Sequence, residues 1–218
     1  MSSMKKETIL VICAHNDDQV FGMGGTIAKY ANEGKTVKTV IFSFGEKSHP
    51  HLKPEVIIKA RVSEAQKSDK IIGGKGTIFL GLKEGRFPEE IEKLGIREKV
   101  RKIIEKEKPS KIFTHSINDA HHDHRAVYHF VKQLTDEIKF KGDIYLFGVW
   151  TPVRIKNRHL PKMVVDVTKT FSRKIEAIKA HQSQQITILS LLWNVYAKAI
   201  MNGSSHNCKY AEVFYKLK

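Results

Sequence analysis

The chain has 218 residues, of which 41% are hydrophobic, so it is long enough to bury one substantial core, and we expect a single domain over residues 1–218. Its 38 Lys and Arg residues outnumber 23 Asp and Glu residues, and this net charge of +15 favours acidic partners in general. The lysines are dispersed without aromatic interleaving, which disfavours a specific nucleic-acid face, and two cysteines exclude a disulfide framework and a CxxC zinc site.

The N-terminal residues predict a cytoplasmic protein. The apolar stretch in "MSSMKKETILVICAHNDD" is about six residues long before the charged segment, too short for a signal peptide or a membrane span. With few cysteines as well, a reducing interior is the expected location.

Apolar runs and helical spacings alternate along the chain. Helices separated by short strands indicate crossover connections, and these predict an α/β fold of three αβα layers with a mostly parallel, Rossmann-like sheet. Ligands are then expected at the carboxyl ends of the strands. We predict strands at 8–14, 36–44, 77–81, 111–115, 143–150 and 162–167, helices at 24–34, 54–71, 91–107 and 124–139, helical structure over 168–202, and an edge strand at 211–218.

The first strand runs into "AHNDDQVFGMGG", residues 14–25. A dinucleotide loop is disfavoured here, because the third spaced glycine is missing and paired carboxylates would repel a pyrophosphate. His15 and Asp18 flank a tight turn and can converge on one cation, and a nitrogen and an oxygen donor suit zinc or a similar divalent ion. The alternative is that Asp17 and Asp18 only cap the following helix.

A second polar cluster, "HSINDAHHDHRAV" at residues 115–127, also follows a strand and opens a helix. His121 and His124 lie three residues apart, so both side chains can face one metal ion. Asp123 can orient an imidazole by a contact with the ring nitrogen that does not bind the metal. We interpret His122 as exposed and His115 as structural. A metallo-β-lactamase-like pattern would require histidine at position 119, and the alternation of strands and helices also disfavours it.

Taken in order, four segments resemble the PIG-L/LmbE-like zinc N-deacetylases. They are "AHNDDQVFGMGGTIAKY", "RVSEAQKS" at 61–68, "NDAHHDHRAV" and "KIEAIKAHQSQ" at 174–184. Two positions depart from the family's pattern, since Asn16 replaces a proline and Gln19 replaces a glutamate. The resemblance spans residues 8–184 and implies that the chain is one PIG-L/LmbE-like deacetylase domain.

The resemblance also implies a role for each residue that matches a motif. One Zn²⁺ per subunit, or another divalent ion, would be held by His15, Asp18 and His124. The remaining roles are general base for Asp17, stabilisation or protonation of the reacting group for His121, and a carboxylate contact of substrate or product for Arg61. For its role His121 should be cationic or a good donor, and Asp123 beside it can favour that state by charge pairing. His181, near a helix end, can support the substrate from the cleft or be a structural hydrogen-bonding residue.

The expected reaction is hydrolysis of an N-acyl amide, which we expect to be N-acetyl, on an amino sugar such as N-acetylglucosamine or its conjugate. Three protein ligands leave a zinc position open for water, as a catalytic site requires. Two alternatives remain, namely another metal-dependent hydrolase such as a phosphoesterase, and an inactive protein that binds metal or carbohydrate.

The segment "ITILSLLWNVYAKAI", residues 186–200, carries more apolar positions than one helix face can hold. It is either a buried core helix or part of a subunit interface of a homo-oligomer, and with Lys198 inside 15 residues it does not span a bilayer. His49 and His51 lie where a substrate-covering lid would be placed, although an exposed loop is the simpler interpretation.

Overall fold

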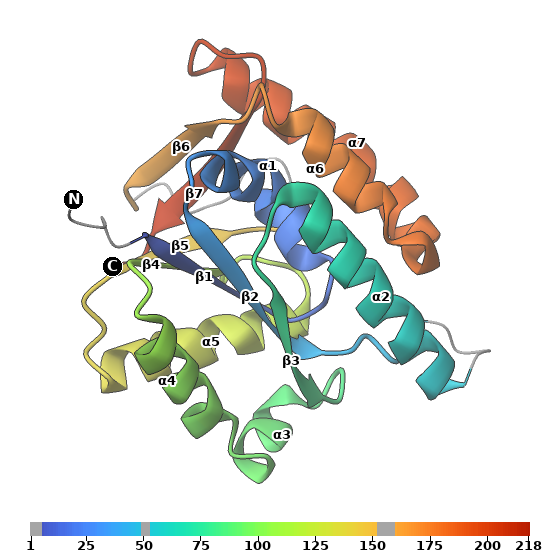
Figure 1. The fold of residues 1–218 in the computed structure, drawn as a ribbon, viewed down its shortest axis with the longest axis vertical. Helices are drawn as coiled ribbons and strands as arrows, with labels where there is room; N and C mark the ends of the chain where they lie inside the picture. Colours follow the sequence, from blue (N-terminus) through green and yellow to red (C-terminus); the bar gives the residue numbers. More distant parts are fainter. Residues whose placement is uncertain (1–5, 49–52, 152–159) are drawn as a thin grey trace.

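The computed structural model describes residues 6–48, 53–151 and 160–218, which form a sheet of seven strands between two layers of helices (Figure 1). The strand order is β3-β2-β1-β4-β5-β7-β6. The strands are β1 (Thr8–Cys13), β2 (Thr36–Ser43), β3 (Thr77–Leu82), β4 (Lys111–His115), β5 (Asp143–Phe147), β6 (Lys162–Asp166) and β7 (Ala211–Lys216).

Helices cover both faces of the sheet, as the three-layer prediction requires. One layer holds α1 (Asp18–Asn32), α2 (Pro54–Ile72), α6 (Phe171–Lys179) and α7 (Gln185–Ser204), with a short 3-10 turn, η1 (Gln182–Gln184), before α7. The other holds α3 (Phe87–Lys93), α4 (Ile96–Glu107) and α5 (His122–Glu137). None of these described helices is long and apolar enough to cross a bilayer.

Strands β3, β2, β1, β4 and β5 are parallel, and only β7 runs against them. The central strand β1 is buried throughout Ile9–Cys13, because each face of a parallel sheet packs on helices. Successive side chains of β1 point to opposite faces of the sheet and belong to two separate cores. Ile9 and Val11 pack under α1, and Leu10 and Ile12 pack against the α3–α5 layer. The predicted α/β fold is therefore confirmed.

The chain leaves β1 towards β2 and returns on the other side at β4, so the sheet has its topological switch point between β1 and β4. Loops that leave adjacent strands in opposite directions open a crevice at their carboxyl ends. Both polar clusters of the sequence follow these two strands. The fold thus brings residues near 15 and near 121 together across about a hundred positions of sequence.

Several elements differ from the predictions in position or extent. The C-terminal strand β7 is an inner strand between β5 and β6, and β6 forms the edge instead. The predicted helix 91–107 is broken into α3 and α4 at Gly95, whose φ of +59° interrupts the helix. Helix α1 begins at Asp18, six residues before the predicted start, and continues across a kink at Met23.

Glu212 of β7 stabilises α1 directly after this kink. Its carboxylate accepts hydrogen bonds from the backbone N–H groups of Gly25 (3.1 Å) and Thr26 (2.7 Å) and from the Thr26 hydroxyl (2.6 Å). Lys174 of α6 completes the set at 2.6 Å, and both charged side chains are almost fully buried. The pair thus ties two helices to the sheet.

Glu212→Ala should reduce the free energy of unfolding by about 3–5 kcal/mol, because it leaves a buried ammonium and two helix N–H groups without their acceptor. Chemical denaturation measures this loss. Glu89→Ala, which removes an exposed ion pair with Arg86, serves as control and should change stability by less than about 1 kcal/mol. Equal effects of the two substitutions would contradict the assigned role of Glu212.

Candidate active site

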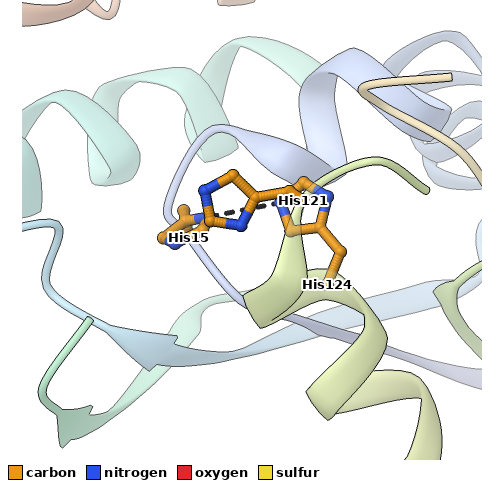
Figure 2. Close-up of side chains that lie close together, drawn as sticks. All are labelled: His15, His121 and His124. Atoms are coloured by element: carbon orange, nitrogen blue, oxygen red, sulfur yellow. Dashed lines mark hydrogen bonds between the residues drawn. The ribbon is translucent and has the colours of Figure 1, made fainter. Parts of the chain in front are cut away.

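The three residues predicted to hold a metal lie together at the switch point. The distances are 3.2 Å from His15 Nδ1 to His124 Nε2, 3.1 Å from His124 Nε2 to Asp18 Oδ1, and 3.5 Å from His15 Nδ1 to Asp18 Oδ2. Ligand atoms on a tetrahedral zinc lie about 3.3 Å apart, given bonds of about 2.0–2.1 Å. Figure 2 shows His15 from the β1–α1 loop turned towards His121 and His124 at the start of α5.

The turn after β1 directs the Asp18 carboxylate into this cluster and leaves the Asp17 carboxylate near Arg61 in the same region. Asp17 is the N-cap residue of α1, but its side chain makes no capping hydrogen bond. Asp18 accepts the backbone N–H of His15 at 2.6 Å and contacts the imidazoles of His115 (3.2 Å) and His124. The interpretation of these aspartates as helix caps alone is therefore wrong.

The cluster favours positive charge. Burial opposes protonation of His15, but the carboxylates of Asp18, Asp123 and Glu84 outweigh it and raise the pKa to about 10. Burial likewise opposes protonation of His124, yet Asp18 and Asp119 raise its pKa to about 9. The ionised carboxylates stabilise a positive charge among them, and the imidazoles can lose their protons and coordinate a metal ion through nitrogen. This set of donor groups is the one that a divalent cation requires, so these residues fit a metal.

Asp119 is a member of the site that the sequence did not predict. One of its oxygens lies 2.9 Å from His124 Nδ1, and the other accepts the backbone N–H groups of Val149 (2.8 Å) and Trp150 (3.1 Å). A carboxylate behind the second ring nitrogen fixes the tautomer and orientation of a metal-binding histidine. Asp119 therefore directs His124 Nε2 into the cluster.

Asp123 and His121 differ from their expected pairing. The Asp123 carboxylate lies 3.3 Å from His15 Nε2 and 3.0 Å from His122 Nε2, whereas towards His121 it offers only its backbone N–H, to Nδ1 at 3.2 Å. Burial, with the charges on His15 and His124, lowers the pKa of His121 to about 4. A neutral His121 with its proton on Nε2, able to donate a hydrogen bond, is thus favoured over a cationic one.

Two neighbouring histidines have the placements expected of them. His122 is exposed, and His115 is fully buried and stacked on His124 with ring centroids 3.9 Å apart. His115 and His121 are both near enough to His124 to complete alternative ligand groups. His115 Nε2 already accepts the backbone N–H of Ala14 at 3.1 Å, so its lone pair is engaged in the structure.

The two positions that depart from the family pattern form hydrogen bonds around Arg61. Asn16 Oδ1 accepts from Arg61 Nε at 2.7 Å and also from its NH2 group, and Asn16 Nδ2 donates to the Arg61 carbonyl at 2.7 Å. Gln19 Nε2 donates to the Asn16 carbonyl at 3.2 Å. Arg61 is thereby held with NH2 3.5 Å from Asp17 Oδ2.

A cleft of about 140 Å³ opens over the cluster. His181 is fully buried beneath this region and is not among the described residues that line the cleft, while His49 and His51 lie outside the described part of the chain. Glu84 and Trp150 line it from loops that no motif marked in the sequence, and Gln184 lines it from η1, at the end of the motif at 174–184. The predicted residues in the lining are His15, Asp17, Asp18, Arg61 and His121.

The fold and this cluster define an α/β protein with a histidine and carboxylate centre at the sheet switch point. A family model described as "PIG-L: GlcNAc-PI de-N-acetylase" matches residues 10–135, more than half of the chain. The chain therefore belongs to the PIG-L family, as its motifs predicted. It is an enzyme of the N-deacetylase class that gives the family its description.

Relatives of known name cover most of the chain. A probable N-acetyl-α-D-glucosaminyl L-malate deacetylase 2 of Bacillus cereus is 26% identical over 83% of this chain and 85% of its own. The 4-oxalmesaconate hydratase of Pseudomonas putida is 24% identical over 95% and 88%. The structure of N,N'-diacetylchitobiose deacetylase from Pyrococcus horikoshii shares the fold, with a TM-score of 0.79 at 24% identity over 97% and 84%.

Asp119→Asn should lower the affinity for Zn²⁺ by about 10–100-fold, because His124 loses the carboxylate that orients it. Titration of metal-free protein against a chelator of known affinity measures this change. Asp143→Asn removes an exposed contact with Lys216, far from the cleft, and should leave the affinity unchanged. Unaltered zinc affinity in Asp119→Asn would show that His124 needs no such support.

Proposed function

We propose that the protein uses Zn²⁺ to hydrolyse the N-acetyl amide of an amino sugar derivative, releasing acetate and a free amine. One observation carries this proposal: Asp17, free of any capping bond, lines the same cleft as His15 and Asp18. A carboxylate beside a metal-binding cluster is placed to accept a proton from water. The family and the Bacillus cereus relative support an acetylated amino sugar as substrate.

His15, Asp18 and His124 would hold the metal. Zn²⁺ held there would supply Lewis acidity that activates water as a nucleophile and polarises a carbonyl. Asp17 accepts the proton of the attacking water at a carboxylate oxygen, and that proton passes to the amine as the carbon–nitrogen bond breaks. The hydroxyl of the water remains on the acyl carbon as part of acetate.

His121 would donate a hydrogen bond to the carbonyl oxygen as negative charge develops on it. Its Nδ1 accepts the Asp123 N–H, which leaves the proton on Nε2, and the residue lines the cleft. A neutral donor fulfils this role without a charge to desolvate. Arg61, fixed by Asn16, would orient Asp17 and contact the carboxylate of the product.

Asp17→Asn should retain bound zinc and lose about 10²–10⁴-fold in kcat for acetate release, since the amide cannot accept the proton. Purified zinc-loaded protein is assayed with N-acetylglucosamine compounds, and metal content is measured on the same samples. Glu89→Ala serves as a surface control. Wild-type protein that releases no acetate from any N-acetylated amino sugar would contradict the proposed function.

Hydration of a carbon–carbon double bond is a second candidate. The hydratase relative covers a larger share of both chains than the Bacillus cereus deacetylase does. Asp17 could equally take a proton from water whose hydroxyl adds to one alkene carbon while a proton adds to the other. Loss of the ultraviolet absorbance of 4-oxalmesaconate, without acetate release from N-acetyl compounds, would favour this reaction.

We further propose that the protein forms a homodimer through α7. Six large apolar side chains on this helix are exposed, and five of them form a row that includes Ile186 at 85%, Leu189 at 76% and Trp193 at 64%. Together with Tyr196 and Ile200, they follow spacings of 3, 4, 3 and 4 residues, which is the a/d pattern of a two-helix seam. Their exposed area is on the order of 500 Å², a large part of the ~800 Å² per partner in a standard interface.

A second copy is the partner that suits this seam. The residues that flank it on α7 are uncharged apart from Lys198, so two copies can approach although each carries a charge of +15. A membrane-binding helix would instead carry Lys and Arg along its polar face. Symmetric pairing of α7 with α7 buries the same patch on both chains.

Trp193→Glu should convert a dimer into a monomer, as measured by light scattering during size-exclusion chromatography. A charge at the centre of the seam cannot be desolvated without a partner. Val56→Glu, at a 55% exposed apolar position on α2, is the matched control and should stay dimeric. A monomeric wild-type protein would contradict the assigned interface.

A further inference from the structure

A second cavity of about 230 Å³ lies beside the metal cleft, between α7 and the β5–β7 side of the sheet. It is larger than the cleft and shares three lining residues with it, namely Phe21, Val149 and Leu191. Because the two spaces adjoin, a molecule whose acyl group occupies the cleft can extend its remaining part into this cavity. The proposed reaction assigns it no role.

Lys198 of α7 lines the cavity as a partly buried cation without a carboxylate partner. Its Nζ donates to the Thr151 hydroxyl at 2.7 Å, and no described carboxylate forms an ion pair with it. The undescribed residues 1–5, 49–52 and 152–159 contain no Asp or Glu. Lys174, the other lysine at this depth, is already paired with Glu212, so Lys198 is the cation available to a ligand.

Burial lowers the pKa of Lys198 to about 8, although the charge of Asp119 acts in the opposite direction. Most molecules of the protein therefore carry a protonated, positively charged Lys198 at neutral pH. Holding such a charge away from water is costly unless an anion or strong acceptor accompanies it. The arrangement is thus stabilised by a negatively charged ligand group.

Asn194 stands one helical turn before Lys198 and lines the same cavity. Its Nδ2 donates to the Thr151 carbonyl at 3.2 Å, which fixes the amide, and no group of the described residues donates to its buried Oδ1. A buried carbonyl oxygen that no group donates to is destabilising. It is positioned to accept a hydroxyl or N–H group from a ligand.

We propose that this cavity binds a hydroxylated anionic group, a phosphate or carboxylate with a neighbouring hydroxyl, on the part of the substrate beyond the acylated amino sugar. Lys198 would contact the anion and Asn194 Oδ1 would accept the hydroxyl. Lys162, exposed at the rim, adds a second positive charge. This inference rests on the proposed deacetylation for its link to a substrate, whereas binding of the anion does not depend on turnover.

The direct test is calorimetric titration of the metal-free protein with glycerol 1-phosphate and with inorganic phosphate. Lys198→Met should weaken both affinities by about 10–100-fold, the range expected for a lost charged hydrogen bond. Asn194→Ala should weaken glycerol 1-phosphate binding more than phosphate binding. Lys102→Met on α4, whose side chain is 71% exposed on the other layer, is the control and should change neither affinity.

Thr151→Val separates ligand binding from a purely structural role. If Lys198 and Asn194 only anchor Thr151, removal of its hydroxyl should impair binding as Lys198→Met does, and that result would overturn the proposal. The expected result is that Thr151→Val keeps the anion affinity. Lys198→Gln, checked for folding by circular dichroism, replaces Lys198→Met if that variant is unstable. Absence of anion binding by the wild type would also overturn the proposal.

Turnover then identifies the source of the anion. The ratio of kcat/KM for N-acetylglucosamine 1-phosphate over methyl N-acetylglucosaminide should exceed one and fall about 10-fold or more in Lys198→Met. A sugar joined through phosphate to a lipid in neutral vesicles distinguishes a lipid headgroup from a free phosphate. If no compound is turned over while Lys198-dependent binding persists, the proposed function fails and the anion site stands.

Discussion

The buried carboxylate of Asp18 is the contact on which the arrangement of the cleft depends. Burial alone would raise its pKa, but the imidazoles of His124, His115 and His15 hold it well below its ordinary value. These histidines come from three segments, the β1 loop, the end of β4 and the first turn of α5. The buried negative charge of Asp18 is stabilised only when the segments that follow β1 and β4 are packed together at the switch point of the sheet.

The sequence was sufficient to predict residues whose positions follow from the ends of strands. His15, Asp18 and His124 lie in the loop or the first helical turn that follows β1 or β4, and parallel strands place such residues at one edge. Asp119 could not be predicted in the same way, because its role depends on backbone N–H groups of Val149 and Trp150 some thirty residues later. The parallel direction of strands β1 to β5 was predictable, whereas the order of the strands and the inner position of β7 depend on pairing that periodicity does not encode.

Two lysines show the same limit for charged groups. Lys174 and Lys198 both occur in helical segments with apolar neighbours, so the sequence gives no reason to treat them differently. In the structure Lys174 forms an ion pair with Glu212 of β7, while among the described residues Lys198 hydrogen-bonds to the Thr151 hydroxyl and forms no ion pair. Strand β7, at the end of the chain, therefore decides which of the two lysines stabilises the fold and which is available to a ligand.

The turn at residues 14–25 replaces one source of rigidity with another. The family's proline would restrict the turn through its fixed φ, which removes backbone freedom without any side-chain partner. Asn16 instead fixes the turn through three hydrogen bonds with Arg61, and Gln19 adds a fourth hydrogen bond, from its Nε2 to the Asn16 carbonyl. Since Arg61 in turn contacts Asp17, this substitution couples the position of the proposed base to the position of the guanidinium. The departure from the family's pattern therefore alters how Asp17 is held, while its carboxylate still lines the cleft.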